Sequence, residues 1–235
     1  MSEPTYNRRT IVGGSVLAAG LMAATQAPSA LAGTGSAFWR PALEPQDAWL
    51  DKSGTRHRLV VDSASAAAAA EAVAVADGFY ASNASGYHLG PETLGVVIVL
   101  RHLATPFGYN DAVWSRYGSA FAEKLRLSGE NAIRAVHGNP LLGAAAPTRG
   151  SDPGSHGANR EPTLAGLQAK GARFAVCGAA TAYLAKILAG TGGEPANVER
   201  ELKDNLIPGG VLMASGIVAV NRAQEQGYAI VATTP

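Results

Sequence analysis

The sequence has one cysteine, few charged residues and no long hydrophobic run. A single cysteine excludes an internal disulfide and any zinc or iron–sulfur site built from several cysteines, and it leaves a free thiol, a bond between chains or a redox role. The 19 basic and 18 acidic residues are interspersed, so the sequence indicates no basic field of the kind that a nucleic-acid backbone requires. We therefore expect no nucleic-acid partner.

The first part of the chain has the order of an export signal. Arg8 and Arg9 precede an apolar run over residues 11–24, and small residues follow up to Ala32. The run is shorter than the roughly 20 residues that span a bilayer. The paired arginines before branched apolar residues resemble a twin-arginine signal, although Asn7 stands where such signals more often carry serine or threonine. The resemblance implies a signal peptide at 1–32, folded export to the periplasm or outside, and no stable membrane span after cleavage. The alternative is a plain amino-terminal membrane anchor.

The length of 235 residues and the 47% hydrophobic content suit one globular domain after removal of a signal. Residues 33–56 are predicted to form an extended arm anchored by Trp39 and Trp49. In residues 57–235, apolar runs alternate with helical patterns, which implies right-handed crossovers and a parallel sheet. The predicted strands are 58–62, 95–100, 172–177, 208–215 and 228–232. The expected fold is a flavodoxin-like three-layer α/β domain with a mostly parallel five-stranded sheet.

A long insertion interrupts this domain at residues 137–161, where glycine and proline are frequent and no apolar period is present. It contains His137 and His156, which could hold a metal in principle. There is no close ligand spacing and no carboxylate at a helical interval, so we expect no metal site. No residue pattern calls for a cofactor.

Cys177 ends the strand predicted at 172–177 and begins the helix that follows. Unpaired N–H groups and the positive end of the helix dipole favour a thiolate at such a position. Sites in open α/β sheets form beyond the carboxyl ends of the strands. That edge is predicted to carry Asp62, Arg101, His102 and Ser215 around Cys177. An arginine and a histidine beside the sulfur would stabilise its negative charge and make it a nucleophile or a sulfur carrier.

Each of these residues also has a plainer interpretation. Cys177 is a buried small hydrophobe in the alternative reading, since free cysteine is among the most buried residue types. Arg101 can pair with Asp62 or Glu92, and His102 can be a surface or packed histidine. A hydrolase with Cys177 as nucleophile and His102 as base is a further possibility that needs an orienting group and an oxyanion hole.

The carboxyl-terminal part of the chain resembles a known family. The run RFAVC at 173–177 with its helix, and IPGGVLMASGIVAVNRAQEQGY at 207–228, are similar to DsrE/DsrF-like (YchN-like) proteins. The resemblance covers about the last 65 residues well. It implies a homo-oligomer, a trimer or hexamer, and a cysteine, here Cys177, that carries sulfur as a persulfide.

Together, the residues and the resemblance predict an exported protein that binds or relays sulfur through Cys177 as thiolate or persulfide, with a sulfur donor or acceptor protein as a possible partner. Any activity would be of the sulfur-transfer type. The alternative is a non-catalytic oligomeric protein that binds a ligand or partner and has a structural cysteine. The family's sulfur relays are cytoplasmic, whereas this chain carries an export pattern.

Overall fold

The structure is a computed structural model that describes residues 40–143 and 162–233. The chain divides into a unit of residues 1–40 and a unit of residues 41–235, and the fold described here is that of the second unit. The expected export signal, Trp39 and His156 lie outside the described residues. No helix in the described part of the chain is both long and apolar enough to cross a membrane.

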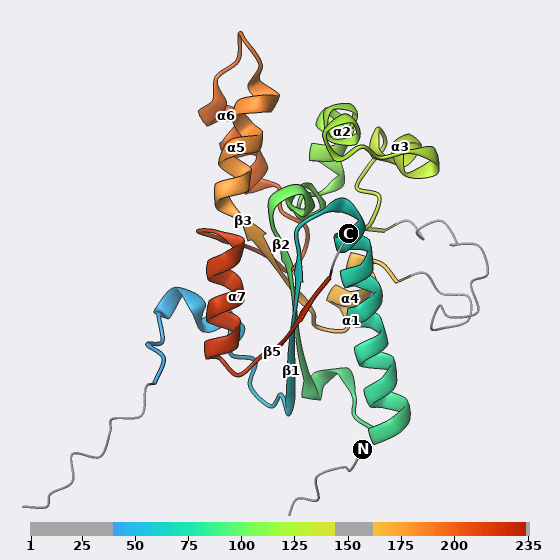
Figure 1. Ribbon diagram of the computed structural model, residues 1–235, viewed down its shortest axis with the longest axis vertical. Coiled ribbons are helices and arrows are strands. Elements are labelled where there is room, and N and C mark those ends of the chain that lie inside the picture. Colours follow the sequence, from blue (N-terminus) through green and yellow to red (C-terminus); the bar gives the residue numbers. More distant parts are fainter. Residues whose placement is uncertain (1–39, 144–161, 234–235) are drawn as a thin grey trace, which may run out of the picture. The chain divides into compact units, whose positions relative to one another are not determined.

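Five parallel strands form one sheet in the order β4-β3-β2-β1-β5 (Figure 1). The strands are β1 His57–Ser63, β2 Leu94–Leu100, β3 Arg173–Cys177, β4 Gly210–Met213 and β5 Ala229–Ala232. Each coincides with a predicted strand to within a few residues. The flavodoxin-like three-layer α/β domain expected from the sequence is confirmed, and its sheet is entirely parallel rather than mostly so.

The described residues also form seven α-helices and three short 3-10 helices. The α-helices are α1 Ala66–Tyr87, α2 Asp111–Leu125, α3 Gly129–Ala135, α4 Leu164–Ala169, α5 Gly178–Ala189, α6 Pro195–Asp204 and α7 Gly216–Glu225. The 3-10 helices are η1 Pro45–Leu50, η2 Pro91–Thr93 and η3 His102–Gly108. By residue type and position the sequence predicts Asn110 or Asp111 as the cap of α2, Ser215 as the cap of α7 and Gly227 as its left-handed stop. These caps are confirmed, because Asn110 caps α2, Ser215 caps α7 and Gly227 follows α7 with φ +82°.

Three predictions of local structure differ from the observed elements. The arm at 33–56 is not extended throughout, because Pro45 at the first helical position starts η1 and Leu50 is buried in the core. The sequence predicts Pro162 at the first position of a helix, but Thr163 is the N-cap of α4 and accepts a hydrogen bond from the Gly166 N–H. The sequence also predicts a brief helix over residues 198–206, but α6 begins at Pro195, with proline in the first turn.

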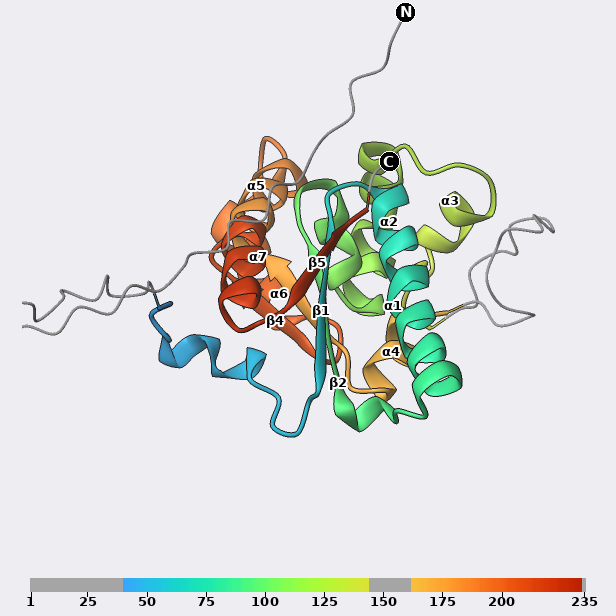
Figure 2. The same ribbon diagram turned by 60° about the horizontal axis from the view of Figure 1, so that its bottom comes forward.

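Successive residues of the central strands face opposite layers. Val61, Ile98 and Val176 belong to a large hydrophobic cluster that includes α1, α2, α4 and α5. Val60, Val99 and Ala175 belong to a smaller cluster completed by α7 and by Leu50 of η1. Figures 1 and 2 show α1 and α4 on one side of the sheet and α7 with η1 on the other. The runs of strand residues are apolar throughout because both faces are covered.

The direction of the crossovers explains this uneven layering. From β1 to β4 each connection steps to the next strand on the same side, so right-handed crossovers put the intervening helices on one face. The connection from β4 to β5 runs back across the sheet, so α7 lies on the other face. As a result, the chain leaves the neighbouring strands β3 and β4 toward opposite faces. A crevice between diverging connections is where open α/β sheets bind ligands.

The aromatic residues Trp114, Tyr117 and Phe121 recur at helical spacing, which predicts that they face the core, and in α2 they pack into or against it. Trp114 and Phe121 are fully or almost fully buried, with ring centres 5.0 Å apart. The Trp114 Nε1 donates a hydrogen bond to the Pro106 carbonyl at 2.8 Å, and its ring lies 5.4 Å from the ring of Phe107. α2 thereby anchors η3, the segment that follows β2 at the carboxyl edge of the sheet.

Candidate functional site

A cavity of about 390 Å³ lies at the carboxyl ends of β3 and β4, where α5 and α7 begin. Of the predicted site residues, Arg101, His102, Cys177 and Ser215 line it, and Asp62 does not. The starts of two helices therefore face one crevice. The positive ends of their dipoles favour a negative charge there.

Cys177 is both the last residue of β3 and the N-cap of α5. Its Sγ accepts a hydrogen bond from the Ala180 N–H at 3.4 Å. The residue is only 6% exposed, yet it lines the cavity. The sulfur is a free thiol at a helix start, as predicted, and access to it runs through the crevice rather than from open surface.

Buried hydrogen bonds hold the backbone of Cys177. The Thr181 Oγ1 donates to the Cys177 carbonyl at 2.9 Å, and the Tyr109 hydroxyl lies 2.8 Å from the Thr181 Oγ1. Burial raises the pKa of Tyr109, and the nearby Cys177 charge raises it further, although the hydrogen bond with Thr181 opposes these effects. A neutral phenol thus supports the start of α5.

Two glycines allow the helix starts to approach the strands closely. A Cβ on Gly178 would lie 2.7 Å from the Met213 carbonyl oxygen, so α5 begins directly against the end of β4. A Cβ on Gly216 would lie 2.3 Å from the Cβ of Arg101. The first turn of α7 therefore packs on the Arg101 side chain, which no larger residue at 216 would permit.

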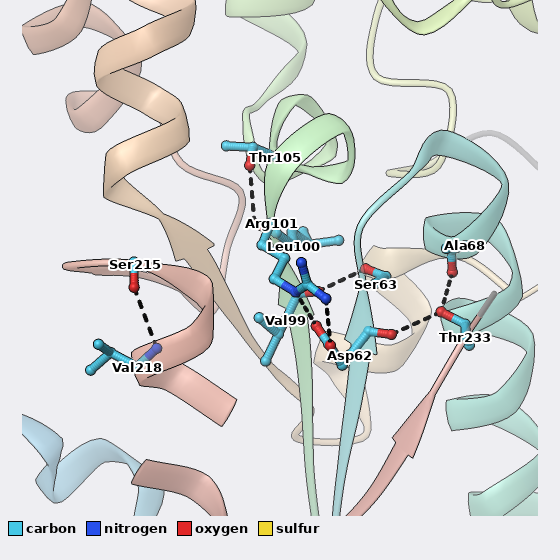
Figure 3. A network of polar contacts seen from close by, with 10 residues as sticks. All are labelled: Asp62, Ser63, Ala68, Val99, Leu100, Arg101, Thr105, Ser215, Val218 and Thr233. Atoms are coloured by element: carbon cyan, nitrogen blue, oxygen red, sulfur yellow. Dashed lines mark hydrogen bonds and ion pairs between the residues drawn. The ribbon is translucent and has the colours of Figure 1, made fainter. Parts of the chain in front are cut away.

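Arg101 forms a two-pronged ion pair with Asp62, one of the two partners that the sequence allowed (Figure 3). Its Nε donates to Oδ1 at 2.7 Å and its Nη2 to Oδ2 at 2.9 Å. The hydrogen bonding with Asp62 raises the pKa of Arg101, burial lowers it, and the charges of Asp62 and Cys177 raise it. Nη1 has no hydrogen-bond partner among the described residues. Asp62, outside the cavity, thus orients the Arg101 guanidinium, which keeps its positive charge in the crevice that Cys177 also lines.

The backbone of Asp62 is held by Thr233, the last described residue of the chain. Thr233 donates to the Asp62 carbonyl from both its N–H, at 2.9 Å, and its hydroxyl, at 3.0 Å. The next residue, Ser63, donates its hydroxyl to the Val99 carbonyl at 2.7 Å. Figure 3 shows the Ser63 hydroxyl bonded to Val99 of β2 and the Thr233 hydroxyl, which follows β5, bonded to Asp62 of β1.

His102 is exposed and has a left-handed backbone with φ +53°. A residue other than glycine pays roughly 1–2 kcal/mol for that conformation. The turn is held by hydrogen bonds from the Leu103 N–H to the Ala64 carbonyl and from the Ala104 N–H to the Arg101 carbonyl. In the described chain His102 makes no side-chain hydrogen bond, with Cys177 or any other residue. The geometry therefore gives the Cys177–His102 hydrolase no support.

Ser215 caps α7, and its Oγ accepts a hydrogen bond from the Val218 N–H at 3.4 Å (Figure 3). As the acceptor in that bond, the hydroxyl still has its own proton to donate. Ser215 lines the crevice at the start of α7, just after β4, which is paired with the strand that carries Cys177. Ser215 is therefore a further polar group in the cavity, besides Cys177, Arg101 and His102.

The structure adds residues to the site that sequence reasoning missed. They come from η3 and from α2, α5 and α7: Leu103, Lys124, Ala179, Ala180, Tyr183, Leu184, Gly216 and Ile217. Lys124 lies in the last turn of α2, and its Nζ is 5.5 Å from the centre of the Tyr183 ring. Of these residues, only those in the first turns of α5 and α7 could have been expected from the sequence, because they follow Cys177 and Ser215 at the predicted edge of the sheet.

His137, by contrast, does not belong to the crevice. It lines a separate cavity of about 280 Å³ with Asp111 and Asn139, beside the start of α2. Within residues 40–143 and 162–233, no group of three or more histidine, cysteine or acidic side chains is arranged to hold a metal ion.

Comparisons of the chain with protein-family models, with curated proteins and with solved structures found no match. The function of the crevice must therefore be argued from its own geometry. A free thiol, a guanidinium held by a carboxylate and the starts of two helices meet there. Together these groups can stabilise a negatively charged sulfur.

Proposed function

We propose that this protein binds and passes on sulfur through Cys177, as thiolate or persulfide. The observation that carries the proposal is that the only cysteine lines a crevice with the Arg101 guanidinium and two helix starts. A cation and helix dipoles stabilise an anion on sulfur, and the thiolate is the form of cysteine that attacks. Arg101 would stabilise the anion, and Asp62 would position Arg101.

The transfer step conserves atoms and electrons. The Cys177 thiolate attacks the outer sulfur of an organic persulfide, and a new S–S bond forms. The S–S bond of the donor breaks, and the organic thiolate leaves with its electron pair. The proton of the donor stays on the transferred sulfur, so Cys177 becomes a persulfide that an acceptor thiol can attack in turn.

Mass spectrometry of the intact protein tests this proposal. After treatment with sodium tetrasulfide, an inorganic source of sulfane sulfur, we expect the native protein to gain the mass of one or more sulfur atoms. Dithiothreitol should remove the gain. Cys177→Ala should show none, because the sequence has no other thiol. A native protein without an adduct, or an equal adduct in Cys177→Ala, would remove the proposal.

The second candidate is a binding protein in which Cys177 only packs, and the 6% exposure of that residue favours it. The two functions differ in how fast the native thiol reacts. Iodoacetamide should alkylate a working Cys177 in the folded protein at a rate comparable to that of the urea-unfolded chain. Alkylation that requires unfolding would instead support the structural role.

We also propose, from the sequence resemblances, that the chain is a DsrE-like protein exported by the twin-arginine route and assembled as a homo-oligomer. The edge strand β5 supports the assembly, because Ile230 and Val231 are 42% and 39% exposed on its opposite faces. Its residues carry no charge or proline that would protect a free edge. Light scattering after gel filtration should give a trimer or hexamer, and a clean monomer would contradict this expectation.

A further inference from the structure

The crevice beside Cys177 is larger than a sulfur atom or a small inorganic anion needs. Its volume of about 390 Å³ falls among the cavities of about 300–1,000 Å³ that hold small organic ligands. Much of its wall is apolar, from Leu103, Leu184 and Ile217 together with the Tyr183 ring. Tyr183 and Ile217 are 55% and 62% exposed, so this apolar surface is open to a carbon skeleton.

The charges around the crevice have one sign. Arg101 and Lys124 line it, and no aspartate or glutamate does so among the described residues. Arg101 is already paired with Asp62. Lys124 has no carboxylate partner in the described chain, and its one close contact is with the Tyr183 ring. Lys124 is therefore available to bind a negatively charged group of a ligand.

The two cations serve different groups. Arg101 and Cys177 follow the paired residues Leu100 and Val176 of neighbouring strands, and both line the crevice. Lys124 comes from α2, contacts the Tyr183 ring and takes no part in the ion pair with Asp62. A ligand that spans from the thiol to Lys124 has its reacting sulfur at one end, an apolar part beside Tyr183 and a negative group at the other end.

We infer that the sulfur compound exchanging with Cys177 is a small organic anion, with an apolar body against Tyr183 and a carboxylate or sulfonate bound by Lys124. This inference rests on the proposed function, because it names the class of donor or acceptor for the same thiol. Inorganic polysulfide has neither part, so it would leave the apolar wall and Lys124 unused.

Two aromatic disulfides of similar shape provide the test. Dithiobis(nitrobenzoate) carries carboxylates, and dithiodipyridine is neutral. With either reagent the Cys177 thiolate attacks one sulfur, a new S–S bond to Cys177 forms, the S–S bond of the reagent breaks and an aromatic thiolate leaves. Each rate is measured by stopped-flow absorbance for the native protein and divided by the rate for the urea-unfolded chain. We expect this ratio to be about fivefold higher for the anionic reagent at low salt, and the preference to fade as salt screens the charges.

Variants identify the groups responsible. Lys124→Gln should abolish the preference for the anionic reagent. Lys186→Gln should keep it, since Lys186 is an exposed lysine of α5 that does not line the crevice. Tyr183→Ala should slow both aromatic reagents in the native protein, because it removes apolar surface against which their rings would pack.

The outcomes separate this inference from the proposed function. A tetrasulfide adduct on Cys177 without any preference between the aromatic reagents, or with equal effects of Lys124→Gln and Lys186→Gln, overturns the inference and leaves the sulfur relay. A preference that depends on Lys124, without a tetrasulfide adduct, supports an organic-anion site and removes the relay. If neither reagent reaches the native thiol, although both react with the unfolded chain, both proposals fall.

Discussion

Replacing Trp114 with alanine is expected to lower the free energy of unfolding by about 3–5 kcal/mol. The side chain is fully buried between Phe107 and Phe121, so its removal leaves a cavity in the largest cluster of the core. It also removes the hydrogen bond from Trp114 to the Pro106 carbonyl of η3, which then keeps only the bond from the Tyr109 N–H. Urea denaturation followed by circular dichroism measures the loss.

A matched pair of conservative variants tests the hydrogen-bond part of this argument. Trp114→Phe retains an aromatic ring but removes the bond to Pro106, whose carbonyl still accepts from the Tyr109 N–H, and we expect the lost bond to cost about 0.5–1.5 kcal/mol. Trp49→Phe removes an indole N–H that is buried and has no partner, so its cost should be close to zero. Equal losses in the two variants would show that the bond from Trp114 to η3 contributes little.

Replacing Arg101 with methionine is expected to cost about 2–3 kcal/mol of stability. Methionine leaves the Asp62 carboxylate, whose side chain is 11% exposed, without its two charge-assisted hydrogen bonds. Arg101 itself is 29% exposed, so water moderates the effect. The same variant should slow the reaction of Cys177 with iodoacetamide, because the thiolate loses the guanidinium that lines the same crevice.

A double-mutant cycle separates the ion pair from the packing of the arginine stem. If Asp62 destabilises the variant because it is an unpaired charge, Asp62→Asn combined with Arg101→Met should be more stable than Arg101→Met alone. Arg101→Lys should restore only part of the stability, since lysine cannot make the two-pronged contact. Additive effects of Asp62→Asn and Arg101→Met would contradict a coupled pair at this edge of the sheet.

The prediction of this edge succeeded where a rule links sequence position to place in the fold. Asp62, Arg101 and Cys177 each stand at or just after the end of an apolar run, and parallel strands bring such ends to one edge. Ser215 was assigned as a cap from its type and its place before a helix, and the structure has it there. Asp62 lies behind Arg101 instead of in the cavity, because the guanidinium reaches back over the end of β1.

The same reasoning could not find Lys124 and Tyr183. Both are ordinary residues of amphipathic helices, and no spacing or cap connects α2 to α5 along the chain. They meet because α5 packs on η3 and α2 contacts η3 through Trp114. The start of η1 within the predicted arm was missed for a related reason, since six residues provide too short a window for a helical period.

What the sequence determined by itself was the alternation of strands and helices, the caps at Asn110 and Ser215, and the position of the thiol between a strand and a helix. These are local properties, set by side chains within a few residues of one another along the chain. The tertiary structure alone decided that Asp62 holds Arg101, that Lys124 stands over Tyr183, and that α5 and α7 open on one crevice. Those contacts depend on the strand order and on the return of the chain from β4 to β5, which no local pattern of residues encodes.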